Sequence, residues 1–246
     1  MPGFISVDSV GDVALVRIDR PPANALDVEL LAEGQATADK LRGALPSAVV
    51  LTGRPGFFSA GADLKVVPTL DPAGQRDMVI GINGLFTNWY SFPRPVVCAV
   101  NGHAIAGGLI LALCGDYRVG PTSGRFGLTE LRVGIPYPAA AMAIVRAELT
   151  PPAARLLTLR ANLLEADAAH GLGLFDEIAE GGGVVERALE VAGELASLPP
   201  ATYEHVKMDL RRETIAETRR AVDEHSDPLL ARWFGDEAVS AAQERG

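Results

Sequence analysis

The chain has 246 residues, of which 48% are hydrophobic, so it can bury a large core as one domain or as a domain with a small appendage. Its net charge of −9 argues against nucleic acid or an anionic membrane as a partner, although local cations could still hold an anionic small molecule. Residues 1–8 lack the basic start and apolar run of a signal peptide. Cys98 and Cys114 stand in apolar surroundings and are expected to be buried free thiols, which fits a cytoplasmic protein.

The first half of the chain predicts alternating strands and helices. Residues 13–19 predict a strand with residues 4–8 as its hairpin partner, and Asp27 predicts the cap of a helix that runs to about residue 45. Two buried strands and two helices are then expected at residues 48–52 and 95–100 and at residues 75–91 and 107–113. This alternation indicates an α/β core with parallel strand pairing.

Residues 95–115 are long and apolar enough to resemble a membrane span. However, Asn101, Gly102 and His103 interrupt the run, and Gly107 and Gly108 interrupt it again. We therefore expect a buried strand, a tight turn and a buried helix, and no membrane partner.

The pattern becomes mainly helical from Pro151 onward, and it is strongest over residues 184–198 and 203–224. The sequence therefore predicts an α/β core over residues 1–198 and a helical C-terminal segment over residues 199–246.

Two glycine-containing loops each follow an apolar strand, at residues 59–65 (Ser-Ala-Gly-Ala-Asp-Leu-Lys) and 101–108 (Asn-Gly-His-Ala-Ile-Ala-Gly-Gly). Small residues leave backbone N–H groups uncovered, and two such loops that point at one spot could stabilise a developing oxyanion. Taken singly, each loop could instead be only a tight turn.

Glu130 is the third feature, because it stands among apolar residues and glycines in Gly-Leu-Thr-Glu-Leu-Arg-Val-Gly-Ile-Pro, residues 127–136. Burial would raise the pKa of its carboxyl group and let it move protons near neutral pH. The alternative is a surface carboxylate paired with Arg132.

In their order and spacing these features resemble the crotonase (enoyl-CoA hydratase/isomerase) superfamily. The resemblance begins at Arg-Pro-Pro-Ala-Asn-Ala-Leu, residues 20–26, and includes both glycine loops and Cys-Gly-Asp-Tyr-Arg at residues 114–118. Its strong part ends at Pro136, so it covers most of the chain.

The resemblance implies a fold, a substrate class and a catalytic group. The fold is a spiral of ββα units closed by C-terminal helices that drive homotrimers, often paired into hexamers. The substrate is an acyl-CoA thioester, with no separate cofactor and no metal. The thioester oxygen would accept hydrogen bonds from the backbone N–H groups of Ala62 and Gly107, and Glu130 would carry the proton.

Further residues match positions that bind CoA or the acyl group in the family. Arg20 and Lys65 are candidates to contact the phosphates, although either could be only a solvated surface charge. Tyr137 could narrow the acyl pocket or donate a hydrogen bond, and Arg245 replaces a lysine that meets phosphate. The complete set of expected binding residues is Arg20, Ala23, Ala60, Asp63, Leu64, Lys65, Ile110, Tyr137 and Arg245.

One position departs from the hydratase pattern, because hydratases of the family carry a second glutamate where this chain has Ile110. An isoleucine can neither hold water nor deliver a proton, whereas moving a double bond needs only one base. The sequence therefore favours an enoyl-CoA isomerase in fatty acid metabolism. The alternatives are a hydratase with a single glutamate and a non-catalytic acyl-CoA binding protein.

The C-terminal segment carries an apolar stripe formed by Leu229, Leu230, Trp233 and Phe234. A single chain would be expected to leave such a stripe partly exposed, so it supports a trimer or a dimer of trimers.

Overall fold

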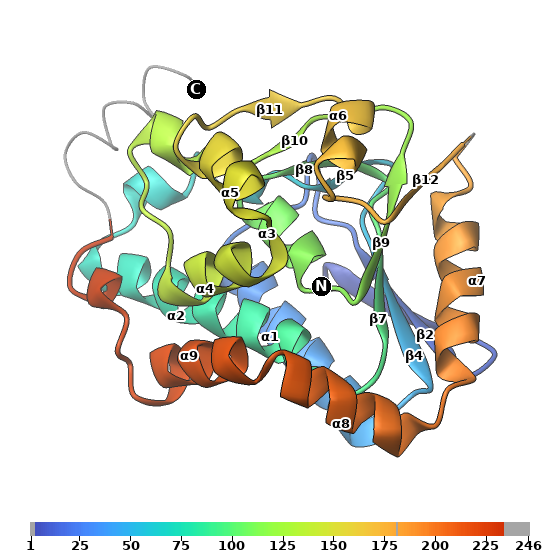
Figure 1. Cartoon of the computed structure of the whole chain (residues 1–246). Helices are drawn as coiled ribbons and strands as arrows, with labels where there is room; N and C mark the ends of the chain where they lie inside the picture. Colours follow the sequence, from blue (N-terminus) through green and yellow to red (C-terminus); the bar gives the residue numbers. More distant parts are fainter. Residues whose placement is uncertain (1–2, 181, 234–246) are drawn as a thin grey trace.

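A computed structural model describes residues 3–180 and 182–233 (Figure 1). Its largest sheet has six strands, and every neighbouring pair is parallel except the hairpin of the first two strands. The strand order is β1 (Ile5–Val10), β2 (Val13–Ile18), β4 (Ala48–Thr52), β7 (Val96–Ala99), β9 (Tyr117–Pro121) and β12 (Glu177–Ala179).

A second sheet has four short strands, and a two-stranded sheet lies beside it. The four strands are, in order, β11 (Leu163–Leu164), β10 (Phe126–Gly127), β8 (Gly102–Ile105) and β5 (Gly56–Ser59); the pair is β3 (Ala25–Leu26) and β6 (Gly61–Ala62). The chain passes from the large sheet to the second sheet three times, from β4 to β5, from β7 to β8 and from β9 to β10. This repetition confirms the expected α/β fold with a spiral of ββα units.

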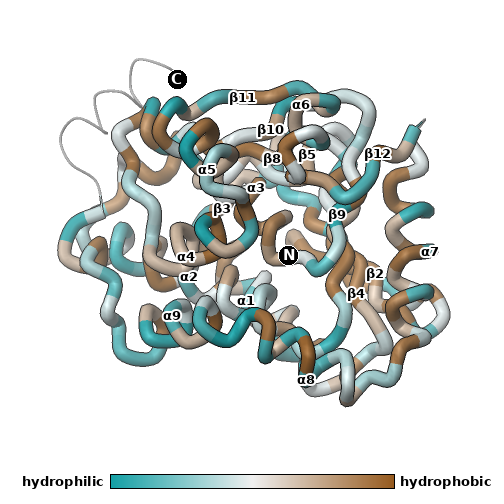
Figure 2. Tube along the Cα trace, in the orientation of Figure 1, coloured by the Kyte–Doolittle hydropathy of each residue, from teal (hydrophilic) through white to brown (hydrophobic). Residues whose placement is uncertain are grey.

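Helices cover both faces of the six-stranded sheet (Figure 1). One face carries the main core and the helices α1 (Val28–Ala44), α2 (Pro72–Tyr90), α3 (Gly107–Leu113) and α4 (Ala139–Glu148), and the other carries α7 (Val184–Ala196). The shorter elements are η1 (Val67–Thr69), η2 (Glu130–Val133), α5 (Pro151–Thr158), α6 (Ala166–Gly171) and η3 (Pro228–Leu230). Figure 2 shows hydrophobic colours on the central strands, whereas α9 (Arg212–Asp223) carries hydrophilic stretches.

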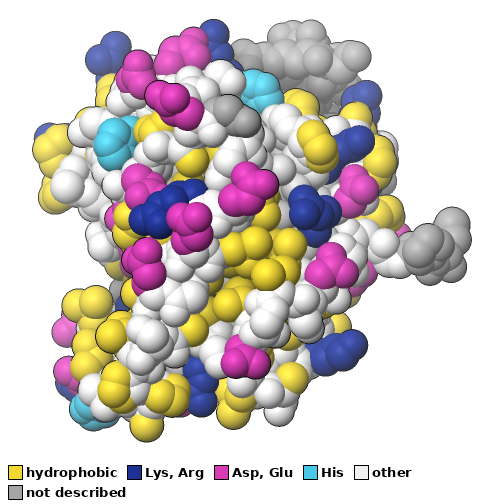
Figure 3. All heavy atoms as spheres, turned by 90° about the vertical axis from the view of Figure 1, so that its right-hand side faces the viewer, with side chains coloured by type: hydrophobic (Ala, Val, Ile, Leu, Met, Phe, Trp, Pro, Cys, Tyr) yellow, Lys and Arg dark blue, Asp and Glu magenta, His cyan; other side chains and the backbone are white. Residues whose placement is uncertain are grey.

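Strand β4 shows why the sheet needs helices on both sides. Val49 and Leu51 point into the main core, while Ala48 and Val50 pack under α7, and all four are buried. The α7 side of the molecule shows hydrophobic side chains in the middle of the face with acidic and basic side chains around them (Figure 3). The predicted buried strand at residues 48–52 is confirmed.

The apolar run at residues 95–115 forms β7, β8 and α3, as expected. No helix within residues 3–180 and 182–233 is long and apolar enough to cross a membrane. Cys98 and Cys114 are buried free thiols, which confirms that expectation.

The second half of the chain differs from the prediction in two ways. It contains the short strands β11 and β12, where only helices were expected, because strands of two or three residues have too few positions to show a period. In addition, the expected helix at 203–224 is two helices, α8 (Pro200–Leu210) and α9, which meet where the Arg211 side chain turns into the core.

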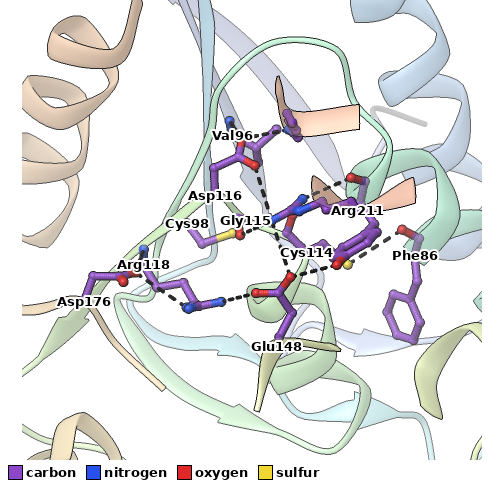
Figure 4. A network of polar contacts seen from close by, with 12 residues as sticks. Phe86, Val96, Cys98, Cys114, Gly115, Asp116, Arg118, Glu148, Asp176 and Arg211 are labelled. Atoms are coloured by element: carbon purple, nitrogen blue, oxygen red, sulfur yellow. Dashed lines mark hydrogen bonds and ion pairs between the residues drawn. The ribbon is translucent and has the colours of Figure 1, made fainter. Parts of the chain in front are cut away.

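Buried ion pairs attach α8 and α9 to the core (Figure 4). The Asp116 carboxylate accepts hydrogen bonds from Lys207 Nζ at 2.7 Å and from the Val96 backbone N–H at 2.8 Å, and Arg211 Nη2 lies 3.3 Å away. Burial lowers the pKa of Lys207 to about 8, and Asp116 opposes that shift. These contacts give Asp116 a structural role, while the predicted boundary at residue 199 stays a prediction.

Arg211 and Glu148 extend this network toward the centre of the molecule. Arg211 donates to the backbone carbonyls of Tyr90, Cys114 and Gly115 at 2.9–3.1 Å. Glu148 accepts from the Tyr90 hydroxyl at 2.8 Å and from Arg118 at 3.3 Å. Each buried charge of this network therefore has a counter-charge or several hydrogen bonds, which buried ions require.

We predict that Asp116→Ala destabilises the protein by about 3–5 kcal/mol, because it leaves Lys207 and Arg211 buried without their shared counter-charge. Equilibrium unfolding in urea measures this loss. Arg212→Ala is the control, since it removes an exposed ion pair to Asp209 and should cost only about 0–1 kcal/mol. Equal small losses in both variants would contradict the prediction.

Candidate active site

A narrow cavity of about 60 Å³ lies where the two glycine loops, α2 and the segment after β10 come together. Residues from all parts of the fold form its wall: Leu26, Ala60, Ala62, Leu64, Ile82, Phe86, Ala106, Gly107, Ile110, Thr129, Glu130, Val133, Ile135, Pro136, Tyr137, Pro138, Ala141 and Trp233. The lining is almost entirely apolar, as is usual for small-molecule sites.

The two glycine loops touch each other at Gly61. A Cβ atom on Gly61 would lie 2.7 Å from the Ala106 Cβ atom and 2.9 Å from the Gly107 backbone nitrogen, so no side chain fits. Gly61 also has a φ of +78°, which glycine adopts readily. Because Ala62 follows Gly61 directly, this contact brings the backbone of Ala62 close to that of Gly107, as the oxyanion-hole hypothesis requires.

The first loop is held by its neighbour β3. Ala60 N–H donates to the Ala23 carbonyl at 3.0 Å, and Asp63 N–H donates to the Leu26 carbonyl at 2.9 Å. Ser59 Oγ lies between the same two segments, since it donates to the Asn24 carbonyl at 2.7 Å. The loop is therefore a fixed part of the sheet region.

The second loop contains a strained residue. Ala106 has φ 54° and ψ −129°, a conformation that costs a non-glycine residue about 1–3 kcal/mol. Its N–H donates to the Gly127 carbonyl at 2.8 Å, which holds the strained peptide in place. Gly107 is the first residue of α3, and the N–H at that position has no acceptor within a helix. This geometry leaves the Gly107 N–H available to a ligand.

Glu130 is buried at the start of η2, with 9% of its surface exposed. Burial raises the pKa of its carboxyl group to about 7, although its own backbone N–H and the Tyr137 hydroxyl favour the charged form. Neither Glu130 Oε2 nor the Tyr137 hydroxyl completes a hydrogen bond with a described residue. Arg132 is exposed and makes no ion pair with Glu130, so the alternative of a surface ion pair is wrong.

Ile110 lines the same cavity from α3 and is 1% exposed. Of the described residues that form the wall, Glu130 is the only one with a carboxylate. Among the described residues of the wall, Glu130 is thus the one acid in an apolar setting, and the Ile110 side chain has no group that could hold a water molecule.

The expected CoA-binding residues fall into two groups. Ala60, Leu64, Ile110 and Tyr137 line the cavity, together with the proposed catalytic residues Ala62, Gly107 and Glu130. Asp63 and Lys65 belong to the first loop and Arg20 and Ala23 contact it, but none of the four lines the cavity. Arg245 lies outside the described residues. The binding role of each residue stays a prediction.

Arg20 has a structural function that the sequence did not reveal. Its guanidinium group lies 2.6 Å from Asp27 and 2.9 Å from Asp63, and it donates to the Ala25 carbonyl at 3.1 Å. These contacts neutralise its charge and tie the first loop to the start of α1. Lys65 is exposed and makes no ion pair with a described residue, so it is the freer cation of the two.

Sequence reasoning missed the wall formed by Ile82, Phe86 and Trp233. Ile82 and Phe86 lie four residues apart on α2, a spacing that predicts one helix face but not the cavity it adjoins. Trp233 is only 3% exposed, and Leu229 and Leu230 pack half-buried against the core. The expectation that a single chain leaves this stripe partly exposed is therefore wrong for Trp233 and holds for Leu229 and Leu230, while Phe234 lies outside the described residues.

We predict that Glu130→Gln changes the pH dependence of stability. The pKa of Glu130 is raised from 4.5 to about 7 on folding, so wild-type stability is full below pH 4.5 and falls as pH rises through 7. The amide cannot ionise, so the variant should gain about 3 kcal/mol relative to wild type between pH 4.5 and pH 8. Urea unfolding at several pH values measures this difference. The exposed Glu213→Gln is the control, and a parallel pH profile for Glu130→Gln and wild type would contradict the prediction.

Known proteins resemble this chain over nearly its whole length. A sequence model of the enoyl-CoA hydratase/isomerase family matches residues 9–238. A putative enoyl-CoA hydratase of Thermus thermophilus is 37% identical over 202 residues, which cover 80% of this chain and 79% of the relative.

Two solved structures show the same fold. The apo structure of a Mycobacterium tuberculosis enoyl-CoA isomerase covers 95% of this chain and 100% of its own, with a TM-score of 0.86 and 31% identity. Human mitochondrial Δ3-Δ2-enoyl-CoA isomerase covers 98% of this chain and 96% of its own, with a TM-score of 0.90 and 26% identity. With the geometry above, these matches establish that the chain belongs to the enoyl-CoA hydratase/isomerase family, within the crotonase superfamily.

Proposed function

We propose that this protein moves the double bond of enoyl-CoA thioesters between the 3 and 2 positions, in fatty acid metabolism. The observation that carries the proposal is a single carboxylate, Glu130, in an apolar cavity whose opposite wall has Ile110 in place of a second acid. Two relatives of known structure are described as enoyl-CoA isomerases, which agrees with this assignment.

The reaction needs one base and one anion site. The thioester oxygen accepts hydrogen bonds from the N–H groups of Ala62 and Gly107. Glu130 removes a proton from C2 of the 3-enoyl chain, and the C–H electron pair becomes part of a dienolate whose charge rests on that oxygen. Glu130 then returns the proton at C4, and the electrons form the C2=C3 bond. No water and no second acid take part.

The properties of Glu130 suit this proton shuttle. A pKa of about 7 lets the group accept and return a proton at neutral pH with little free-energy difference between its two forms. Its unpartnered Oε2 is free to face the substrate. The Tyr137 hydroxyl, whose pKa burial raises, stays protonated and can donate a hydrogen bond to the carboxylate or to the substrate.

The second candidate is hydration by Glu130 alone. It is favoured by the description of the Thermus thermophilus relative as a putative hydratase, and the Tyr137 hydroxyl could help to hold a water molecule. A non-catalytic acyl-CoA binding protein is disfavoured, because a binding site has no use for a buried carboxyl group with one oxygen left without a hydrogen-bond partner.

We also propose where CoA binds and how the chains assemble. The CoA chain lies along the first glycine loop, with its phosphates near Lys65 and its adenine near Ala60 and Asp63. A homotrimer or a dimer of trimers is proposed from the family. The exposed Leu210 and Val206 on α8 give such an assembly apolar surface to bury.

We predict that Gly61→Ala lowers kcat for enoyl-CoA isomerisation by roughly 10²-fold or more, since the new Cβ atom forces Ala62 and Gly107 apart and one oxyanion donor is worth about that factor. Gly56→Ala is the matched control. Gly56 has a similar φ of +83°, but its Cβ would meet no atom within 4 Å. Both variants place an alanine at a similar positive φ, so both carry a similar backbone strain. Equal kcat values in the two variants would show that the Gly61 contact does not position the oxyanion donors.

We predict that the wild-type protein isomerises 3-enoyl-CoA faster than it hydrates 2-trans-enoyl-CoA, and that Ile110→Glu shifts this ratio toward hydration. A glutamate at position 110 would place a second carboxylate beside a water molecule, as in hydratases of the family. Burying this charge lowers the stability of the folded protein. Ile110→Gln is the control, because it adds a polar group without a base. The two activities are scored separately by product analysis. Efficient hydration of crotonyl-CoA by the wild type, without isomerisation, would refute the isomerase assignment.

A further inference from the structure

Residues 224–233, here called the C-terminal strap, run from the end of α9 back to the cavity. The strap is anchored by Asp227, which is 3% exposed. The Asp227 carboxylate accepts hydrogen bonds from Asn83 Nδ2 at 2.8 Å and from the Ala139 N–H at 2.7 Å, and it also caps η3 through the Leu229 N–H at 2.9 Å. A charged group with this many donors fixes the strap at one point.

This anchor lies next to the active-site wall. Asn83 directly follows Ile82 on α2, and Ala139 begins α4 two residues after Tyr137. Asn83 Oδ1 also accepts from the Ala140 N–H at 2.9 Å, so α2, the start of α4 and the strap are joined at one place. The position of the strap is therefore coupled to the wall that faces Glu130.

Trp233 stands six residues beyond the anchor and fills part of the cavity. Its indole Nε1 donates to the Pro136 carbonyl at 3.1 Å, and its side chain lines the cavity together with Ile82 and Phe86. The remaining volume is about 60 Å³, well below the roughly 150 Å³ at which an apolar cavity holds one benzene ring. A long acyl chain needs more space than this, and Trp233 is the bulkiest side chain among the described residues of the wall.

We infer that Trp233 sets the acyl-chain length of the substrate, with Asp227 as the residue that positions it. This inference rests on the proposed function for the identity of the ligand, an acyl-CoA thioester. Short acyl groups fit between Glu130 and the indole ring. Longer groups require the part of the strap beyond Asp227 to swing away, which breaks the bond to Pro136.

Binding of saturated acyl-CoA thioesters tests the inference without any turnover, because they have no double bond to move. Wild-type protein should bind butanoyl-CoA more tightly than dodecanoyl-CoA in calorimetric titrations. Trp233→Ala should improve dodecanoyl-CoA affinity relative to butanoyl-CoA by roughly tenfold or more, the gain expected when about two further methylene groups are buried. Trp89→Phe is the matched control, because Trp89 is buried in the core and does not line the cavity.

Asp227→Asn supplies a second, milder test. The amide keeps the size of the carboxylate but loses its charge, and its Nδ2 cannot accept from the backbone N–H groups, so the strap should loosen. In a Trp89→Phe background, emission from Trp233 should then shift to the red as its ring meets water, and the chain-length preference should move in the same direction as in Trp233→Ala.

The outcomes separate the inference from the proposed function. An unchanged chain-length preference in both Trp233→Ala and Asp227→Asn would overturn the inference while leaving the isomerase proposal intact. Chain-length changes in a protein that never isomerises would support the inference and refute the proposed reaction. Failure of wild type to bind any acyl-CoA would overturn both.

Discussion

The contact of Gly61 with Ala106 and Gly107 is the constraint on which the site depends. It joins two loops that belong to successive turns of the ββα spiral, and it leaves no room for a side chain at position 61. The strained backbone of Ala106 shows that the fold accepts an energetic cost to keep this geometry. Hydrogen bonds from Ala60 to Ala23 and from Ala106 to Gly127 hold each loop in its sheet, so neither can withdraw on its own.

The side chains of Asp116 and Glu130 are both largely buried, but only Asp116 lies beside counter-charges. Asp116 is surrounded by Lys207, Arg211 and a backbone N–H, and it holds the C-terminal helices on the core. Glu130 is buried without a counter-charge, so its pKa rises to about 7 and one oxygen has no partner. A fully paired carboxylate could not accept a proton from a weak carbon acid near neutral pH, because its pKa would be held too low. The incomplete pairing of Glu130 is therefore what the proposed proton shuttle requires.

The sequence predicted the elements with strong periodicity and missed those with little. Asp27 caps α1 as predicted, and the seventeen residues of that helix are enough to show a helical period, since Leu30, Leu31, Ala38 and Leu41 are buried. The strands β11 and β12 were missed, since two or three residues show no alternation. The loops and Glu130 were found from motif spacing. Trp233 and the pairing of Arg20 depend on contacts between distant segments, which a single sequence does not contain.

Different contacts hold the two parts of the cavity wall in place. One part is formed by the glycine loops, where we propose that the reaction occurs, and the other by the C-terminal strap, which we propose selects the acyl group. Ala62 is held by the pairing of β6 with β3, and Ala106, just before Gly107, is held by its hydrogen bond to Gly127, and neither contact involves a residue of the C-terminal strap. Trp233 instead follows the anchor at Asp227 and donates a hydrogen bond to the Pro136 carbonyl. Under the proposed function, we expect substitutions in the strap to alter which acyl groups enter while the proposed oxyanion site and Glu130 remain in place.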